Sequence, residues 1–128
     1  MTVHVDLLPT LLEVAGAPRP EQPLDGESML PLLRDPSTRR PRREVFYHFP
    51  GYLEGQRAWR TTPVGTIYSG KWKLLEFFET GRLELYDLES DLSEAEDLAA
   101  KLPAQVRELH ARLDTWRRSL NAAIPTMR

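Results

Sequence analysis

The pattern that most constrains the fold is a pair of alternating apolar runs separated by a short turn. Residues 71–78 (KWKLLEFF) and 82–88 (RLELYDL) flank the segment ETG, which contains Gly81. Such runs on either side of a glycine-containing turn are typical of a β-hairpin. In a strand, Trp72 and Leu74 point to one face, and Leu75 and Phe77 point to the other. Because both faces are partly apolar, we expect both to be covered in the native setting.

Two more β-rich runs precede this hairpin, and a helical pattern follows it. The earlier runs are residues 44–49 (EVFYHF), ended by Pro50-Gly51, and residues 63–69. From Leu102 to Leu120 apolar residues recur at helical spacing, and Pro103 suits a helix start. A short coiled coil also fits this spacing. We predict an α+β fold: a small antiparallel sheet of about four strands with an amphipathic helix, residues 103–121, packed on one face.

The N-terminal segment predicts one more helix and a long loop. In DLLPTLLEVAGAP two apolar rows, Leu7/Leu11/Val14 and Leu8/Leu12/Ala15, make a wide stripe that needs a large partner surface. We expect Asp6 to cap this helix and Gly16 to end it. Residues 17–43 form a connection with one helical turn near residues 28–33. The predicted single domain therefore has a connecting helix and loop (1–43), an antiparallel sheet (44–88) and a C-terminal helical segment (89–128).

Composition removes several classes of function. The chain has no cysteine, which excludes disulfides, thiolate metal sites and a cysteine nucleophile. A net charge of −2 gives no electrostatic case for binding nucleic acid or an anionic membrane. The arginine-rich loop STRRPRRE lacks adjacent aromatic platforms and is interpreted as solvated. No apolar run approaches the roughly 20 residues of a membrane helix, and the N-terminus lacks the features of a signal peptide.

No complete catalytic set is present. His4, His48 and His110 do not form a metal-ligand spacing, and no nucleophile-elbow or phosphate-loop motif occurs. The acidic run DLESDLSEAEDLA lacks the spacing of a calcium loop. From the residues alone, this is an α+β module without a self-sufficient active site.

Two features remain candidates for binding. In FYHFPGYL, His48 either hydrogen-bonds a ligand or is a structural histidine fixed among Tyr47, Phe49 and Pro50. Lys71 and Lys73 are two residues apart, hence on one face of a strand. They either contact a ligand or are solvated lysines that protect a sheet edge.

Several segments, taken in order, resemble one enzyme family. VDLLPTLLEVAG followed by LDGESMLPLL is similar to the segment that leaves the catalytic domain of sulfatases, in the alkaline-phosphatase-like superfamily. FYHFPGYL, GKWKLLEFFETGRLELYDLESDLSEAEDLA and AAIP resemble, in the same order, the C-terminal subdomain of bacterial arylsulfatases. Related sequences often read His-Phe-Pro-His-Tyr here, so His48 and Tyr52 match but Gly51 does not. A basic residue is also common where Tyr68 stands.

The resemblance implies a fragment that is not catalytic alone. Sulfatases use a formylglycine, made from Cys or Ser in a C/S-x-P-S/A-x-R context, and a divalent cation, expected to be calcium. This chain has no such sequence, so we expect no cofactor in it. The implied partners are an N-terminal sulfatase catalytic domain and a sulfated small molecule or sugar. The candidate substrate-binding residues are His48, Tyr52 and Lys71, and a longer sulfatase would be periplasmic or secreted.

Two other functions stay open. The chain could be a stand-alone, non-enzymatic interaction module that forms a homodimer through its apolar helix, or a fragment of a phosphodiester or phosphonate hydrolase of the same superfamily.

Overall fold

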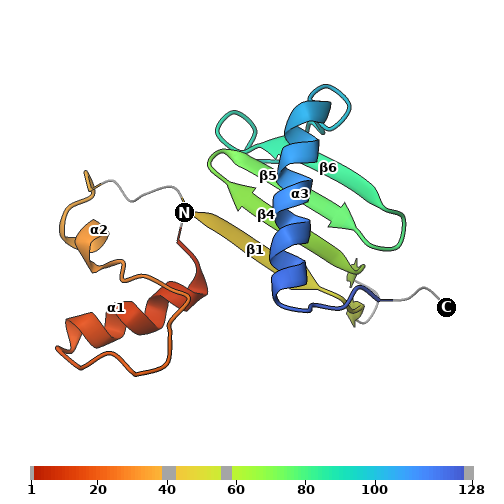
Figure 1. The fold of residues 1–128 in the computed structure, drawn as a ribbon. Helices are drawn as coiled ribbons and strands as arrows, with labels where there is room; N and C mark the ends of the chain where they lie inside the picture. Colours follow the sequence, from red (N-terminus) through yellow and green to blue (C-terminus); the bar gives the residue numbers. More distant parts are fainter. Residues whose placement is uncertain (1, 39–42, 56–58, 126–128) are drawn as a thin grey trace. The chain divides into compact units, whose positions relative to one another are not determined.

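The computed structural model describes residues 2–38, 43–55 and 59–125. The chain divides into two compact units, Met1–Arg42 (unit 1) and Arg43–Arg128 (unit 2). Unit 1 contains the N-terminal helices, and unit 2 contains the sheets and the C-terminal helix (Figure 1). The unit boundary lies beside residue 44, where the sheet was predicted to begin. None of the helices in the described ranges is long and apolar enough to cross a bilayer.

Unit 2 is built on a four-stranded antiparallel sheet, as predicted, and its strand order is β1-β4-β5-β6. Gly70 and Gly81 close the two tight turns at φ of 62° and 67°, a backbone conformation that costs a residue without Cβ little. The alternating runs therefore pair as neighbouring strands. Their bounds are β1 Glu44–Phe49, β4 Val64–Ser69, β5 Trp72–Phe77 and β6 Arg82–Asp87.

A second sheet was not predicted from the sequence. β2 (Leu53–Gly55) and β3 (Trp59–Thr61) pair antiparallel within the connection between β1 and β4. Each strand has three residues, too few for an alternating pattern to stand out. The hairpin projects from the end of the main sheet at which β1 finishes.

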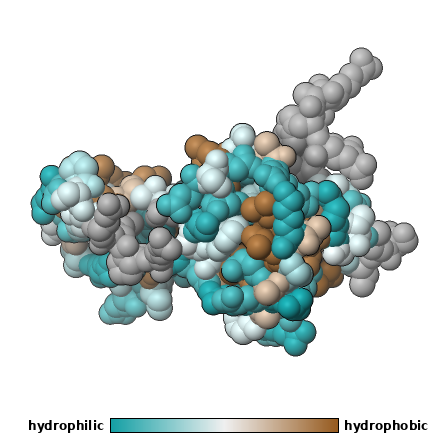
Figure 2. Space-filling model, turned by 90° about the horizontal axis from the view of Figure 1, so that it is seen from above, coloured by the Kyte–Doolittle hydropathy of each residue, from teal (hydrophilic) through white to brown (hydrophobic). Residues whose placement is uncertain are grey.

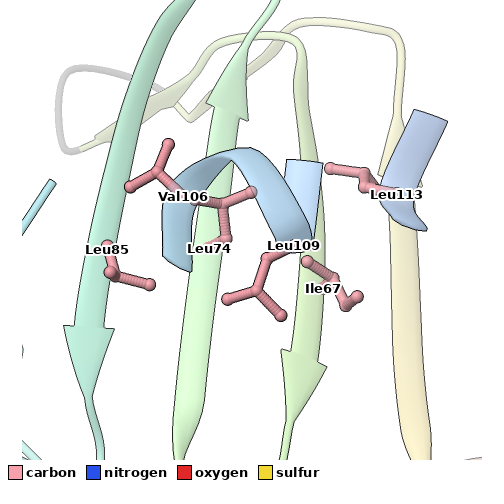
Figure 3. Close-up of a cluster of buried hydrophobic side chains, with 6 residues drawn as sticks. All are labelled: Ile67, Leu74, Leu85, Val106, Leu109 and Leu113. Atoms are coloured by element: carbon pink, nitrogen blue, oxygen red, sulfur yellow. The ribbon is translucent and has the colours of Figure 1, made fainter. Parts of the chain in front are cut away.

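One helix covers one face of the main sheet. α3 (Pro103–Ser119) lies across the strands in Figure 1, and its extent confirms the predicted helix. Three helix side chains interlock with one side chain from each of β4, β5 and β6 (Figure 3). Burial contributes about 2 kcal/mol for each such aliphatic side chain, so this contact holds helix and sheet together. The buried cluster consists of Ile67, Leu74, Leu85, Val106, Leu109 and Leu113.

The opposite face of the main sheet has no described helix of unit 2 upon it, because α3 is the one helix described in this unit. Its β1–β4 half carries uncharged side chains, with Tyr47 and Tyr68 in an edge-to-face contact. Its β5–β6 half carries charges, and Lys73 binds Glu94 at 2.6 Å. The uncharged half consists of Val45, Tyr47, Phe49, Val64, Thr66 and Tyr68.

Unit 1 is organised by a buried carboxylate. Asp6 is fully buried at the start of α1 (Leu7–Val14), but its side chain does not cap that helix. One oxygen accepts the Val3 amide at 3.0 Å, and the other accepts the Glu27 amide at 3.0 Å. The predicted cap is therefore wrong, because Asp6 instead ties the returning loop to the start of the helix. A 3-10 turn (His4–Asp6) precedes α1 and a short helix, α2 (Leu30–Arg34), follows the loop.

Two further contacts hold this loop against α1. Thr10 accepts the Met29 amide at 2.8 Å and donates to the Asp6 carbonyl at 2.6 Å. Gly26 passes so close to the backbone that a Cβ there would lie 2.0 Å from the Val5 carbonyl oxygen. Only glycine therefore fits at position 26, where the loop passes the Val5 carbonyl.

The apolar stripe of α1 lies at the surface. Leu7, Leu8, Leu11 and Val14 are 53%, 51%, 63% and 61% exposed. The buried residues of the helix are Pro9 and Thr10, and Thr10 contacts the returning loop through the Met29 amide. Figure 2 shows brown, apolar surface on unit 1 among its hydrophilic residues.

Candidate functional site

His48 lies on the helix-facing side of β1, one residue before the strand ends. Its Nε2 is 3.0 Å from the carbonyl oxygen of Ala123, in the segment after α3. Its ring contacts the ring of Phe78 at a centroid distance of 5.3 Å. A carbonyl oxygen only accepts, so Nε2 is the donor in this contact and carries a hydrogen. Nδ1 is buried and has no hydrogen-bond partner among the described residues.

Tyr52 lies at the same end of the sheet as His48. Its hydroxyl donates to the Glu79 carboxylate at 2.6 Å, and its side chain is 47% exposed. Glu79 directly follows Phe78 in the turn between β5 and β6. The Phe78–Glu79 pair therefore contacts both sequence-predicted residues, His48 through one side chain and Tyr52 through the next.

Lys71 lies at the other end of the sheet, in the turn before β5. Its ammonium binds Asp87 at 2.5 Å and lies 4.6 Å from the centroid of the Trp72 ring. The hydrogen bond from Lys71 is the main cause of the lowered pKa of the Asp87 carboxyl. The cation thus has an intramolecular partner in this structure.

Lys71 and Lys73 do not act as a pair. Lys71 precedes the first residue of β5, and its ammonium reaches Asp87 on the side of the sheet that α3 covers. Lys73 binds Glu94 and lies 5.6 Å from the Tyr68 ring, on the opposite face. The expectation that both share one face is wrong, since Lys71 belongs to the turn and not to the strand.

The strand register separates the three candidate residues. His48 is aligned with Gly65 and Glu76, whereas the row nearest Lys71 contains Glu44, Ser69 and Trp72. These rows are four residues apart along β1, about 13 Å at roughly 3.3 Å per residue. The structure therefore brings His48 and Tyr52 to one end and places Lys71 at the other.

Sequence reasoning missed a buried charged group that contacts the same aromatic ring as His48. Arg117 is 5% exposed and donates to Glu76 and Asp114 at 2.6 and 2.9 Å. Burial alone would lower the pKa of this guanidinium, but the hydrogen bonds to the two carboxylates outweigh it and raise the pKa. Its guanidinium lies 5.4 Å from the Phe78 ring. Helical periodicity could have predicted that Arg117 is buried, because it follows Leu113 by four residues and therefore lies on the same side of α3.

No metal centre is formed by the described part of the chain. No group of three or more His, Asp or Glu side chains there could hold a cation. Asp91, in the acidic loop after β6, has a lowered pKa chiefly because it accepts the Glu96 amide, so its carboxylate serves the loop backbone.

Comparison with known proteins assigns the fold and its context. A family model described as N-sulphoglucosamine sulphohydrolase, C-terminal, matches residues 1–119. A sulfatase of Formosa agariphila is 38% identical over 113 residues, which cover 80% of this chain and 20% of that protein. Arylsulfatase K of Xenopus laevis is 29% identical, over 85% of this chain and 21% of that protein. A solved 2-O GAG sulfatase superimposes with a TM-score of 0.65 at 28% identity, over 91% of this chain and 25% of that one.

These matches define a class of protein whose C-terminal region has this sheet and helix. The chain belongs to the sulfatase family and corresponds to its C-terminal region. It spans about a fifth of the length of the curated relatives it matches.

Proposed function

We propose that this chain is the C-terminal part of a sulfuric ester hydrolase, where it forms a wall of the substrate pocket and supports the catalytic part. The observation that carries the proposal is the match of the C-terminal family model over residues 1–119. The reaction of the longer enzyme would be hydrolysis of a sulfate monoester, with a sulfated sugar as the substrate class. A relative is described as a 2-O GAG sulfatase, which supports that class.

Support would come through α1. Its four exposed apolar side chains form a continuous stripe, and an exposed apolar patch usually marks an interface. Each leucine that moves from water into a contact contributes about 2 kcal/mol. The partner surface would belong to the sulfatase catalytic domain, which fits a chain about one fifth as long as its relatives.

The substrate rim would be the sheet end that carries Tyr52. The Tyr52 hydroxyl donates its hydrogen to Glu79, so its oxygen and the Glu79 carboxylate offer exposed acceptors for the hydroxyl hydrogens of a sugar. His48 supports this end from inside, because its two ring nitrogens are bound or buried. Lys71 is the competing candidate, and its distance from Tyr52 means that one sulfate group cannot contact both.

The formylglycine and the calcium ion would come from the rest of the enzyme. The residues of this chain do not fit either group: the sequence has no cysteine and no serine followed two positions later by proline. When bound, the cation and formylglycine would supply the nucleophile and neutralise the sulfate. This chain's residues would bind and orient the sugar.

The first test is the genomic sequence upstream of the Met1 codon. An in-frame Cys-x-Pro-Ser-Arg run supports the sulfatase. A threonine at the nucleophile position supports a phosphodiester or phosphonate hydrolase, and a ribosome-binding site directly before Met1 supports the stand-alone interaction module.

The second test is enzymatic. The purified chain should release no sulfate from an aryl sulfate above background, with or without calcium, whereas the polypeptide extended upstream should release it. Metal-dependent turnover that remains with the short chain through repurification would contradict the proposal. In the extended enzyme, Tyr52→Phe should raise KM several-fold with little change in kcat. Lys71→Met is the matched variant: if it alone raises KM, the rim is at the other end of the sheet.

A further inference from the structure

The chain reverses direction at the end of α3. Ala122 donates its amide to the Arg117 carbonyl at 3.1 Å, and Asn121 adopts a left-handed φ of 51°. This is the backbone pattern by which helices commonly end, with asparagine as a tolerated alternative to glycine. The reversal brings residues 122–125 back toward the end of the sheet.

The returning segment binds β1 through one side chain. The Ala123 carbonyl accepts the Nε2 hydrogen of His48, which lies 75 residues earlier in the chain. Because the imidazole Nδ1 is buried without a described partner, this bond is the polar contact that selects the Nε2–H form of the ring.

Packing against an aromatic side chain also fixes the His48 ring. Phe78 contacts His48 at a ring-centroid distance of 5.3 Å, and the Arg117 guanidinium lies 5.4 Å from the Phe78 centroid. A Cβ on Gly65 would come within 3.0 Å of the Phe78 ring, so a bare glycine leaves the space that this ring occupies. His48 is therefore held by the helix end, the aromatic ring and the neighbouring strand.

Two short routes lead from this cluster to Tyr52. Along the chain, His48 precedes Tyr52 by four residues at the end of β1. Through space, Phe78 is followed by Glu79, whose carboxylate accepts the Tyr52 hydroxyl at 2.6 Å. A shift of His48 or Phe78 would therefore disturb one of these two routes to Tyr52.

We propose that residues 120–125 act as a strap that locks His48 through the Ala123 carbonyl and thereby positions Tyr52. His48 is then a positioning residue. That Tyr52 faces substrate rests on the proposed function, but the strap itself does not.

The test uses NMR on the chain as it exists. Long-range proton–nitrogen spectra of the His48 ring should show the Nε2–H tautomer. His48→Ala should speed amide exchange at residues 121–124 by roughly fivefold to tenfold, as expected for one lost hydrogen bond. His48→Gln should restore slow exchange because its side-chain amide nitrogen takes the place of Nε2, whereas the shorter His48→Asn should not. The amides of Ile67 and Leu74 report that the sheet remains folded.

A second variant avoids any change in β1. Removal of residues 122–128 deletes the Ala123 carbonyl and keeps His48, and it should alter the ring tautomer and increase the motion of residues 51–53. An Nδ1–H tautomer in the unaltered chain, or equal exchange at residues 121–124 in His48→Ala and the unaltered chain, would overturn the strap. Faster exchange at residues 121–124 without increased motion of residues 51–53 would overturn the link between the strap and Tyr52. These readouts need no sulfatase activity, so they fail or succeed independently of the proposed function.

Discussion

Arg117 reaches from the last turn of α3 to Glu76 on β5 and donates to its carboxylate at 2.6 Å. His110, two turns earlier on the same helix, has its Nε2 3.2 Å from the other oxygen of Glu76. The Arg117–Glu76 ion pair thus anchors α3 to β5, and Arg112 anchors the same helix to Glu44 of β1 at 2.7 Å.

We predict that removing one partner of this ion pair costs more than removing both. Arg117→Met leaves Glu76 and Asp114 without their buried cation, and it should reduce the free energy of unfolding by about 3 kcal/mol. The double variant Arg117→Met with Glu76→Leu should recover much of that loss. Urea unfolding monitored by circular dichroism measures both values, and strictly additive losses would show that the pair is not coupled.

We predict an alkaline dependence of stability that comes from Tyr86. Burial, followed by the hydrogen bond to Glu84, raises the pKa of Tyr86 to about 12. The folded pKa lies above the unfolded value of about 10, so the contribution is fully present below pH 10 and is lost as the pH rises toward 12. The loss should be roughly 3 kcal/mol.

Tyr86→Phe is the measurement that isolates this group. Its unfolding free energy should fall less between pH 10 and pH 12 than that of the unaltered chain. In an absorbance titration of the folded protein, one of the four tyrosines should ionise near pH 12, and that step should vanish in the variant. Identical pH profiles of stability would contradict the assignment.

We predict that the isolated chain self-associates through α1. Leu8 and Leu11 are 51% and 63% exposed, whereas Leu12 is half-buried, so Leu8→Glu with Leu11→Glu is the cleanest disruption. Light scattering should show a shift from dimer to monomer, with the circular dichroism of the sheet unchanged. Leu92→Glu is the control, because Leu92 is 82% exposed and lies in the loop after β6. A monomer at high concentration before any substitution contradicts the prediction.

We predict that Gly26→Ala disrupts unit 1. A Cβ at this position would meet the Val5 carbonyl at 2.0 Å, and backbone cannot move aside as a flexible side chain can. The contact of Glu27 with Asp6 should be lost, which would be seen as fast exchange of the Glu27 amide. Gly51→Ala, with open space around its Cβ position, should leave the protein unchanged.

The main sheet and α3 could be predicted because their signals are local. The strand Trp72–Phe77 was predicted from the alternation of side chains between two faces. The helix was predicted from the spacing of apolar residues between Val106 and Leu113. Both patterns depend only on residues close in the sequence and on burial of one face. The polar contacts could not be predicted in this way. His48 binds a carbonyl 75 residues away. Asp6 binds an amide 21 residues away, so helix-cap rules could not identify the role of Asp6.

The candidate site shows the same limit. The motif around His48 and Tyr52 was visible in the sequence, but Glu79 and Phe78 became relevant only through the β5–β6 turn that brings them there. Lys71 was assigned to a strand because the exact start of β5 depends on the Gly70 turn. Element boundaries, rather than element types, decided which lysine faced which side.

The strand order has a consequence for how the chain folds. β4, β5 and β6 are successive and joined by tight turns, whereas β1 pairs with β4 across the long connection that holds the β2–β3 hairpin. Local pairs close at low entropic cost, so the three-stranded meander should form early and β1 should add late. Substitutions in the β4–β5 hairpin should then slow refolding, and those in β1 should mainly speed unfolding.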